Sequence, residues 1–299
     1  MNKLYMMVGI PASGKSYNAA IIAERENAVL YSSDDIRALT GLKDADKTDN
    51  SKLFAEINRQ VINDLAEGKN VVYDATNLSA KKRRGFLKQL SKLKIEKICV
   101  LVLRQFVNCV NANEMRKKPV PYQDMRRMYL SFQIPSYTEG WDKIITIYTD
   151  NDETILGKPE EFVNNLVNFK QDNPHHQLTL GNHMLNAYAS VETTDEEVKT
   201  ATLIHDIGKP FTKTFKNSKG EDTPEAHYYN HENVGAYLTM FLDLGKMDKL
   251  HIAFLVNNHM RPFYWTEKSS ERDLNNWGEK LFNEISTIHR ADMENKTED

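Results

Sequence analysis

Cysteine is scarce in this chain, with two in 299 residues, Cys99 and Cys109. Two cysteines cannot form the disulfide framework of a small secreted protein, so a reducing, cytoplasmic setting is expected. No apolar run approaches the roughly 20 residues needed to cross a bilayer, so no membrane partner is expected. Met1–Val8 leads into a glycine motif without a signal-peptide cleavage pattern. Secreted, membrane-spanning and collagen-like classes are thereby excluded.

The composition is that of an ordinary globular protein, with an uneven distribution of charge. Charged residues make up 27% and hydrophobic residues 40%, and the length favours two domains. The net charge of -3 combines 24 Lys and Arg against 17 Asp and Glu in residues 1–150 with 15 against 25 in residues 151–299. A basic half is suited to a polyanion and an acidic half to metal cations, although plain surface variation is the alternative.

Hydrophobic periodicity also differs between the two halves. Strands are expected near residues 3–8, 28–32, 70–74, 96–103 and 144–148, with helices near 15–25, 51–67, 79–93 and 106–134. This alternation predicts an α/β domain with a doubly wound parallel sheet. Later helices are expected near 160–170, 176–192, 196–207, 230–242, 248–260 and 278–292, which predicts an all-α domain. We expect domains at residues 1–152 and 160–299.

A glycine-rich motif lies between the first expected strand and the first expected helix. The segment Gly9-Ile10-Pro11-Ala12-Ser13-Gly14-Lys15-Ser16 fits the phosphate-binding pattern G-x-x-x-x-G-K-[ST]. In such a loop, backbone N–H groups cradle the phosphates of an NTP and Lys15 reaches the β and γ oxygens. The Ser16 hydroxyl is the expected Mg²⁺ ligand. The motif predicts binding of ATP or GTP, with kinase and motor both open.

Polar residues follow the second and third expected strands, at the edge where doubly wound sheets bind ligands. Asp34 is a candidate base for an attacking hydroxyl and Arg37 a candidate for an acceptor phosphate, although Asp34 is equally typical of a helix cap. Asp74 and Asn77 are candidates to contact the acceptor. The basic run Lys81–Arg84 is typical of a solvated helix face, and near an NTP site it is also suited to guide a phosphate backbone.

A basic hairpin is expected after the fourth strand. Two prolines, Pro119 and Pro121, divide a helical stretch that carries Arg116, Lys117, Lys118, Arg126 and Arg127. Such a hairpin is suited to act as a lid whose arginine stabilises the charge on a transferring phosphoryl group. Arg116 is the first candidate for this role.

These segments, in this order, resemble the polynucleotide 5′-kinase family, including the kinase part of phage-type polynucleotide kinase-phosphatases. The resemblance covers about residues 1–150 and rests on the phosphate loop, Asp34, Arg37 and Asp74-Ala75-Thr76-Asn77. It implies that Asp34 is the catalytic base, that Arg37 binds the acceptor phosphate and that a lid arginine lies near Arg116. Phage-type relatives have an acid immediately before the Thr-Asn pair, where this chain has Ala75.

The second half carries regularly spaced metal-ligand residues. Successive gaps of 22, 26, 28 and 33 residues separate the members of the set, which are His183, His205-Asp206, His231, His259 and Asp292. Each gap fits one helix and its connection, so each ligand can come from a different helix of a bundle. Imidazoles and carboxylates form sites suited to Mn, Fe, Co, Ni or Zn. Asp206 has two oxygens and is able to bridge two metals.

The His205-Asp206 pair is the most specific feature of this set, because it follows the apolar segment 201–204 and would be buried. Gly208 fits a helix C-terminus and Pro210 a helix stop. Lys209 is a candidate to bind substrate phosphate or to compensate the helix dipole. His227 is a candidate substrate contact. His175 and His176 precede the first expected ligand helix.

This half resembles the HD-domain phosphohydrolase superfamily over about residues 172–295, most closely the HD domains attached to tRNA-maturation enzymes. The resemblance rests on Asn182-His183, His205-Asp206-Ile207-Gly208-Lys209, Asn230-His231, Asn258-His259 and Ala291-Asp292. It implies one metal held by His183, His205, Asp206 and Asp292. It implies a second held by Asp206, His231 and His259, and activity on phosphomonoesters or 2′,3′-cyclic phosphates of ribonucleotides.

The sequence therefore predicts a bifunctional enzyme that heals nucleic-acid ends, RNA or DNA, such as those of a tRNA-like break. One half would phosphorylate a 5′-OH end and the other would remove a 3′-, 2′- or 2′,3′-cyclic phosphate, leaving ends for a separate ligase. A nucleoside or cofactor kinase fused to a nucleotidase is the second hypothesis. An NTP-binding switch with an inactive HD domain is the third.

Overall fold

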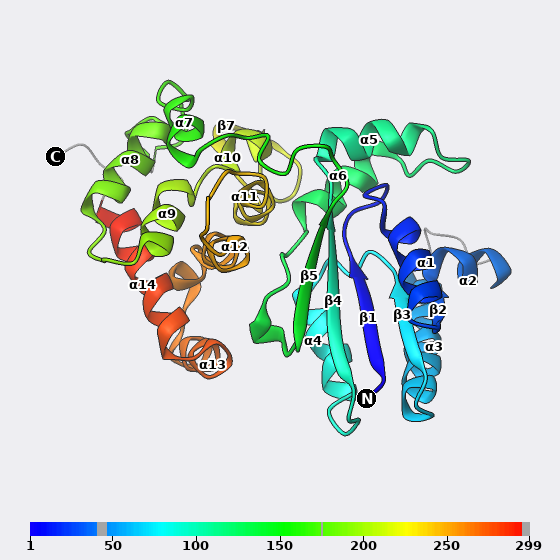
Figure 1. The fold of residues 1–299 in the computed structure, drawn as a ribbon. Coiled ribbons are helices and arrows are strands. Elements are labelled where there is room, and N and C mark those ends of the chain that lie inside the picture. The colour runs from blue at the N-terminus through cyan, green and yellow to red at the C-terminus, as the bar shows by residue number, and fades with distance from the viewer. Residues whose placement is uncertain (41–46, 175, 295–299) are drawn as a thin grey trace. The chain divides into compact units, whose positions relative to one another are not determined.

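Five parallel strands form the sheet of the first half in the computed structural model, which describes residues 1–40, 47–174 and 176–294. The strands are β1 (Lys3–Val8), β2 (Ala28–Ser32), β3 (Asn70–Asp74), β4 (Glu96–Leu103) and β5 (Lys143–Tyr148), in the order β2-β3-β1-β4-β5 (Figure 1). The expected strands and the parallel sheet are confirmed. Because the strand order reverses beside β1, the carboxyl end of β1 lies at the position where such sheets bind ligands.

Helices alternate with these strands. They are α1 (Lys15–Arg25), α2 (Ser33–Thr40), α3 (Lys47–Ala66), α4 (Ala80–Gln89), α5 (Phe106–Glu114), α6 (Tyr122–Leu130) and the short 3₁₀ helix η1 (Tyr137–Glu139). The expected helix over 106–134 is two helices, separated by the segment that contains Pro119 and Pro121. Apolar side chains of α1, including Ala19 and Ile22, pack on the buried face of β1, β3 and β4. This packing fixes the loop between β1 and α1.

The second half is helical, with one small sheet that its sequence did not predict. Its helices are α7 (Pro159–Asn164), α8 (Leu180–Ser190), α9 (Glu196–Ile204), α10 (Lys209–Thr212), α11 (His231–Thr239), α12 (Lys249–Asn258), the 3₁₀ helix η2 (Arg261–Tyr264), α13 (Glu267–Trp277) and α14 (Glu279–Glu294). An antiparallel pair, β6 (Thr214–Lys216) and β7 (Asp222–His227), lies between α10 and α11. The pair is short and largely exposed, so it left no clear apolar alternation.

Aspartate caps begin two of the helices that carry the candidate metal ligands. Asp195 accepts hydrogen bonds from the backbone of Glu197 and Val198 at the start of α9. Asp248 does the same for Leu250 and His251 at the start of α12. These caps satisfy N–H groups that the first turn of a helix leaves unpaired. Both helices are followed directly by a candidate ligand at their C-terminal ends.

The described chain divides into two units by its internal contacts. The first comprises Met1–Tyr129 and Pro135–Asn151, and the second comprises Leu130–Ile134 and Asp152–Asp299. The short segment belongs to the second unit because the Phe132 ring, fully buried, packs 5.3 Å from that of Tyr237. The domain limits of 1–152 and 160–299 stay a prediction. Within the described ranges, no helix combines the length and the apolarity that crossing a membrane requires.

Candidate functional sites

The loop between β1 and α1 has the geometry of a phosphate cradle. A Cβ on Gly9 would lie 2.5 Å from the carbonyl oxygen of Val102, so only glycine fits there without movement. Gly14 has a φ of 91°, in the left-handed region that favours glycine. The Lys15 ammonium is buried and donates to the carbonyl oxygen of Ile10 at 2.7 Å. The loop is thus curled around its own lysine.

This loop contains a buried polar atom that a bound phosphate would satisfy. The Ser13 hydroxyl is fully buried and has no hydrogen-bond partner within the described residues. A buried hydroxyl without a partner is costly, and a phosphate oxygen would satisfy it. The Thr149 hydroxyl donates to the Ser13 carbonyl at 3.0 Å, which holds the loop against the end of β5. The chemistry of the loop therefore fits an NTP.

Electrostatics also prepare the loop for an anion. Burial lowers the pKa of Lys15 to about 8, while the carboxylate of Asp74 acts in the opposite direction. Asp74 is buried at the end of β3, and burial raises its pKa although Ser16 and Lys15 favour its ionised form. Lysine, serine hydroxyl and carboxylate are therefore mutually close. This set suits a phosphate with Mg²⁺, for which the Ser16 hydroxyl is a suitable ligand.

The structure places the residues predicted to act on the acceptor in different surroundings. Asp34 lies in the first turn of α2, mostly exposed, and its Oδ2 atom is 3.3 Å from the Arg116 guanidinium. The structure thus brings Arg116 and Asp34 together. Asn77 donates its side-chain amide to the Met7 carbonyl at 2.8 Å, so it holds the β3 loop against β1. Arg37 lies in α2, and its side chain is outside the described part of the structure.

Arg116 is carried by a loop with its own internal support. The buried Asn113 side chain donates to the Val120 carbonyl at 2.8 Å and accepts from the Val120 N–H at 2.9 Å. These two bonds close the connection between α5 and α6. Because these bonds hold the two ends of the loop together, they restrict the backbone that carries Arg116.

The basic run corrects one expectation. Lys81, Lys82 and Arg84 are exposed, as a solvated face requires. Arg83 is instead 1% exposed and forms two hydrogen bonds with the carboxylate of Glu139, at 2.6 and 2.7 Å. Removing one partner of such a buried pair would leave an uncompensated charge. The expectation of a wholly solvated run was therefore wrong at this residue, because its partner is distant in sequence.

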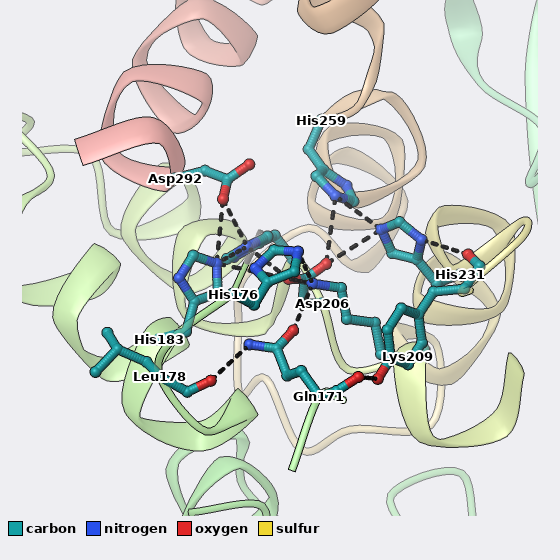
Figure 2. A network of polar contacts seen from close by, with 12 residues as sticks. Gln171, His176, Leu178, His183, Asp206, Lys209, His231, His259 and Asp292 are labelled. Carbon is teal, nitrogen blue, oxygen red and sulfur yellow. Dashed lines mark hydrogen bonds and ion pairs between the residues drawn. The ribbon is translucent and has the colours of Figure 1, made fainter. Parts of the chain in front are cut away.

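The six predicted metal ligands converge in the second unit. They come from α8, the end of α9, the start of α11, the end of α12 and α14, and all are at least nine-tenths buried. In Figure 2, the labelled members of the set, such as His183, Asp206 and His259, point toward one another. Their donor atoms form two groups, one of His183, His205 and Asp292 and one of Asp206, His231 and His259. Within each group the atoms lie within 4.8 Å of one another. Such sets of nitrogen and oxygen donors fit divalent transition metals.

Asp206 faces both groups. Its Oδ1 atom lies 3.1 Å from Nε2 of His231 and 3.6 Å from Nε2 of His259. Its Oδ2 atom lies 3.2 Å from Nε2 of His205 and 3.6 Å from that of His183. Asp292 completes the first group at 3.1 Å from His183. Asp206 is thus arranged to bridge two cations.

Backbone carbonyls orient three of the imidazoles. Nδ1 of His205 lies 2.7 Å from the Thr202 oxygen, and Nδ1 of His259 lies 2.8 Å from the Val256 oxygen. Nδ1 of His231 lies 2.8 Å from the Tyr228 oxygen. A carbonyl only accepts, so Nδ1 carries the proton and Nε2 presents a lone pair to the cluster. The rings are therefore in the tautomer that binds a metal.

A close backbone approach brings Asp206 beside His231. A Cβ on Gly208 would lie 2.1 Å from the His231 carbonyl oxygen and 2.6 Å from the Gly235 nitrogen. Gly208 has ordinary helical angles, with φ -76° and ψ -18°, and Pro210 lies in the first turn of α10. The expectation that these residues end a helix was wrong, since a new helix begins here. Glycine is needed at position 208 because a side chain there would push this backbone segment away from that of His231.

Lys209 is 4% exposed and its ammonium lies 2.6 Å from Oδ2 of Asp206. Burial opposes ionisation of Asp206, but the charge of Lys209 holds the pKa of that carboxyl well below its ordinary value. Burial is likewise outweighed at Asp292, where the hydrogen bond with His183 lowers the pKa. Both carboxylates are therefore in the ionised form that binds cations.

His227, the candidate substrate contact, lies at the end of β7. It is half-buried, and its ring is stacked on that of Tyr229, with 5.4 Å between the ring centroids.

Two neighbours of Lys209, Gln171 and His176, have no role that the sequence pattern predicts. Gln171 lies 2.9 Å from the lysine ammonium, and Nε2 of His176 lies 3.4 Å from it. His175 lies outside the described residues. Gln171 precedes α8 in a segment without helical or strand periodicity, so no pattern signalled it. For His176, its position before the helix predicts a place near the site but no contact with Lys209.

Family models match both units of the chain. Residues 4–135 match the model of an AAA domain, and residues 175–293 match that of an HD domain. No curated protein matches the chain. The first match contains the phosphate loop and Arg116, and the second contains the six predicted metal ligands.

Solved structures show weaker similarity. A candidate kinase from Chloroflexus aurantiacus is 15% identical over 50% of this chain and 85% of its own, with a TM-score of 0.44. A gluconokinase from Sinorhizobium meliloti is 13% identical over 50% and 83%, with a TM-score of 0.38. A Pnkp1/Rnl/Hen1 complex is 22% identical over 40% of this chain and 41% of that chain, with a TM-score of 0.35. Similarity at this level sets no substrate for the protein.

The two family matches agree with the geometry of the two units. The first unit has a five-stranded parallel sheet with a phosphate loop after its central strand. The second has helices that converge on buried histidines and aspartates. The chain thus joins an N-terminal α/β P-loop kinase-like domain to a C-terminal helical HD domain.

Proposed function

We propose that the protein is a bifunctional nucleic-acid end-healing enzyme. The P-loop domain transfers the γ-phosphate of ATP or GTP to a 5′-OH end. The HD domain hydrolyses a 2′,3′-cyclic phosphate to the monoester, and hydrolyses a 3′- or 2′-monoester to the free hydroxyl and inorganic phosphate. The observation that carries the proposal is the presence, in one chain, of a phosphate cradle with a nearby carboxylate-arginine pair and a buried two-group metal cluster. Together the two reactions leave the 5′-phosphate and 3′-OH that a separate ligase joins.

In the kinase reaction, Asp34 takes the proton of the attacking hydroxyl as that oxygen bonds to the γ-phosphorus. The bond from the γ-phosphorus to the bridging oxygen breaks, and the NDP leaves. Lys15 and Arg116 stabilise the charge on the transferring group, while Ser16 holds Mg²⁺. Arg37 and Asp74 bind the acceptor, with Asn77 supporting the loop that carries Asp74. The distance of 3.3 Å between Arg116 and Asp34 supports a shared place beside the acceptor.

In the HD reaction, the six ligands hold one or two divalent ions, Mn, Ni, Co, Fe or Zn. When bound, these ions polarise a phosphoryl oxygen and favour ionisation of water. Lys209 neutralises charge on the substrate phosphate beside Asp206, and His227 contacts the substrate. The 2.6 Å separation of Lys209 and Asp206 supports the first of these roles.

The proposed partner is an RNA end, such as one at a tRNA-like break. The net positive charge of residues 1–150 favours a polyanionic acceptor. Exposed lysines at positions 81, 82, 117 and 118 supply part of this charge. A DNA end offers the same phosphates, so the test compares both.

One experiment addresses both activities. The protein is incubated with ATP, Mg²⁺, Mn²⁺ and an RNA that bears a 5′-OH and a 2′,3′-cyclic phosphate, and both ends are mapped. We expect a 5′-phosphate and loss of the cyclic phosphate. Lys15→Ala should abolish only the first change and Asp206→Ala only the second, because each removes a group from one site. Retained phosphorylation in Lys15→Ala contradicts the kinase assignment.

Competing acceptors test the substrate class. A nucleoside in excess should leave transfer to the RNA nearly unchanged, because it lacks the phosphates that Arg37 is proposed to bind. If the nucleoside is phosphorylated in preference to RNA and DNA, the protein is instead a small-molecule kinase fused to a nucleotidase. NTP binding with neither reaction would identify a nucleotide-dependent switch.

A further inference from the structure

Gln171 makes a buried contact that the metal ligands do not explain. Its side chain is 2% exposed, and its Oε1 atom accepts a hydrogen bond from the Lys209 ammonium at 2.9 Å. The same ammonium lies 2.6 Å from Oδ2 of Asp206 (Figure 2). Lys209 is therefore held between a carboxylate that faces both metal groups and a neutral amide outside them.

The orientation of this amide is fixed by its other contacts. Nε2 of Gln171 donates to the Leu178 carbonyl at 3.0 Å. A carbonyl cannot donate, so Nε2 must face Leu178 and the acceptor Oε1 must face Lys209. The Tyr228 hydroxyl donates to the backbone oxygen of Gln171. Side chain and backbone are both held, so the acceptor is in place before any substrate arrives.

A neutral acceptor has a different effect from a carboxylate. An ammonium has three donors, and two of the partners of Lys209 are Asp206 and Gln171. The amide gives the ammonium a second fixed contact beside Asp206 without cancelling its charge. Were Gln171 unable to accept, Asp206 would be the stronger remaining partner, and the position of the ammonium would be less well defined.

We propose that Gln171 is a positioning residue, which holds the Lys209 ammonium beside Asp206 where it receives the phosphoryl group of the substrate. The proposal rests on the proposed phosphohydrolase function and deepens it. It gives the segment before α8 a part in binding a phosphate monoanion or dianion. His176, from the same segment and 3.4 Å from Lys209, borders this position.

Two variants of the full-length protein test the proposal. Gln171→Met keeps the length of the side chain and removes the acceptor, and Gln171→Glu keeps the shape and adds a negative charge. The probe is inorganic phosphate, measured by calorimetry with the Mn²⁺-loaded protein and as a competitive inhibitor. We expect Gln171→Met to weaken phosphate binding about tenfold, which corresponds to about 1.4 kcal/mol, and Gln171→Glu to weaken it further. Mn²⁺ affinity should change less than about threefold, because no metal ligand is altered.

A double-mutant cycle separates positioning from general support of the fold. In a Lys209→Met background, Gln171→Met should cause no further loss of phosphate affinity, because the group it positions is gone. The matched control is Asn173→Ala, which removes the hydrogen bond from Asn173 to the Ala226 carbonyl in the same segment and leaves Lys209 untouched. It should bind phosphate as wild type does.

Several results would overturn the proposal. They are unchanged phosphate affinity in Gln171→Met, an additive effect in the Lys209→Met background, or an equal loss in Asn173→Ala. If wild type binds phosphate but hydrolyses no phosphoester with Mn²⁺, the proposed hydrolase function fails. The calorimetric cycle still decides the role of Gln171 in that case, because it measures binding without turnover.

Discussion

At Gly208, the lack of a side chain sets the distance between two backbone segments. The residue follows Asp206 by two positions and lies against the backbone of His231, where an added Cβ would meet the carbonyl oxygen at 2.1 Å. Gly235 lies on the other side, and its own Cβ would meet Val256 at 3.0 Å. The distance between Asp206 and His231, two ligands of the same group, therefore depends on glycines that carry no ligand atom.

We predict that Gly208→Ala separates Asp206 from His231. Relief of the clash must displace backbone, so we expect a loss of about 1–3 kcal/mol in the free energy of unfolding and a loss of metal-dependent hydrolysis of at least tenfold. Urea denaturation and phosphate release measure these effects. Gly85→Ala is the control, because no atom lies within 4 Å of its added Cβ. Wild-type Mn²⁺ affinity in Gly208→Ala would contradict the prediction.

The residues that sequence could predict are those whose chemistry follows a local pattern. Lys15 lies in a contiguous motif, and the metal ligands, with His205 and Asp206 adjacent, recur at the spacing of one helix and its connection. Their assignment as ligands rested on the resemblance to HD domains as well as on this spacing. Gln171 and the Arg83–Glu139 pair lack such a pattern. Their partners are 38 and 56 residues away, and only the folded chain brings them together.

At the scale of elements, one histidine joins three helices of the second unit. His251 on α12 lies 2.6 Å from the carboxylate of Glu197 on α9 and 2.7 Å from that of Glu284 on α14. Lys280 also approaches Glu284, at 3.5 Å. The hydrogen bond with Glu284 raises the pKa of His251 above its ordinary value, although burial acts against this. The charged imidazolium thus links the helices that carry His205, His259 and Asp292.

We predict that this link depends on pH. Because the pKa of His251 is higher in the folded than in the unfolded chain, its contribution to stability is complete below the unfolded value of about 6.5. It is lost as the pH rises through the raised folded value. The difference in free energy of unfolding between wild type and His251→Gln, measured by urea denaturation from pH 5 to 9, should therefore shrink as the pH rises. A constant difference would show that the charge has no role.

The same scale explains which elements were predictable. The inner strands β1, β3 and β4 follow from apolar runs that are buried on both faces, as a parallel sheet requires, while the edge strands β2 and β5 are partly exposed. The helix α13 is mostly polar, with Leu274 and Trp277 near its C-terminal end and Asp273 as its buried residue, and it was not expected. The hairpin of β6 and β7 is polar and mostly exposed, so its sequence has no alternation of apolar residues.

At the scale of the whole molecule, each unit has its own candidate ligand site. The nucleotide loop belongs to the first unit and both metal groups belong to the second. Each ligand should therefore stabilise the unit that binds it.

We predict that Mn²⁺ slows hydrogen exchange in α8, α9, α11, α12 and α14, and that ATP with Mg²⁺ slows it in α1. At a concentration of 100 times Kd, each ligand adds about 2.7 kcal/mol to the stability of its folded unit. Mass spectrometry of exchanged peptides measures both effects. Asp206→Asn should abolish the response to Mn²⁺ and keep the response to ATP. Protection of residues 9–16 by Mn²⁺ without nucleotide would contradict the prediction.

The placement of Leu130–Ile134 has a consequence for any attempt to divide the gene. These five residues precede Pro135–Asn151 in the chain but belong to the helical unit, where the Phe132 ring fills space beside Tyr237. A fragment that begins at Asp152 would encode a helical half with a void at that ring. No single cut in the coding sequence therefore gives each unit all of its own residues. To exchange the helical unit with that of another gene, residues 130–134 must be exchanged together with the segment that begins at Asp152.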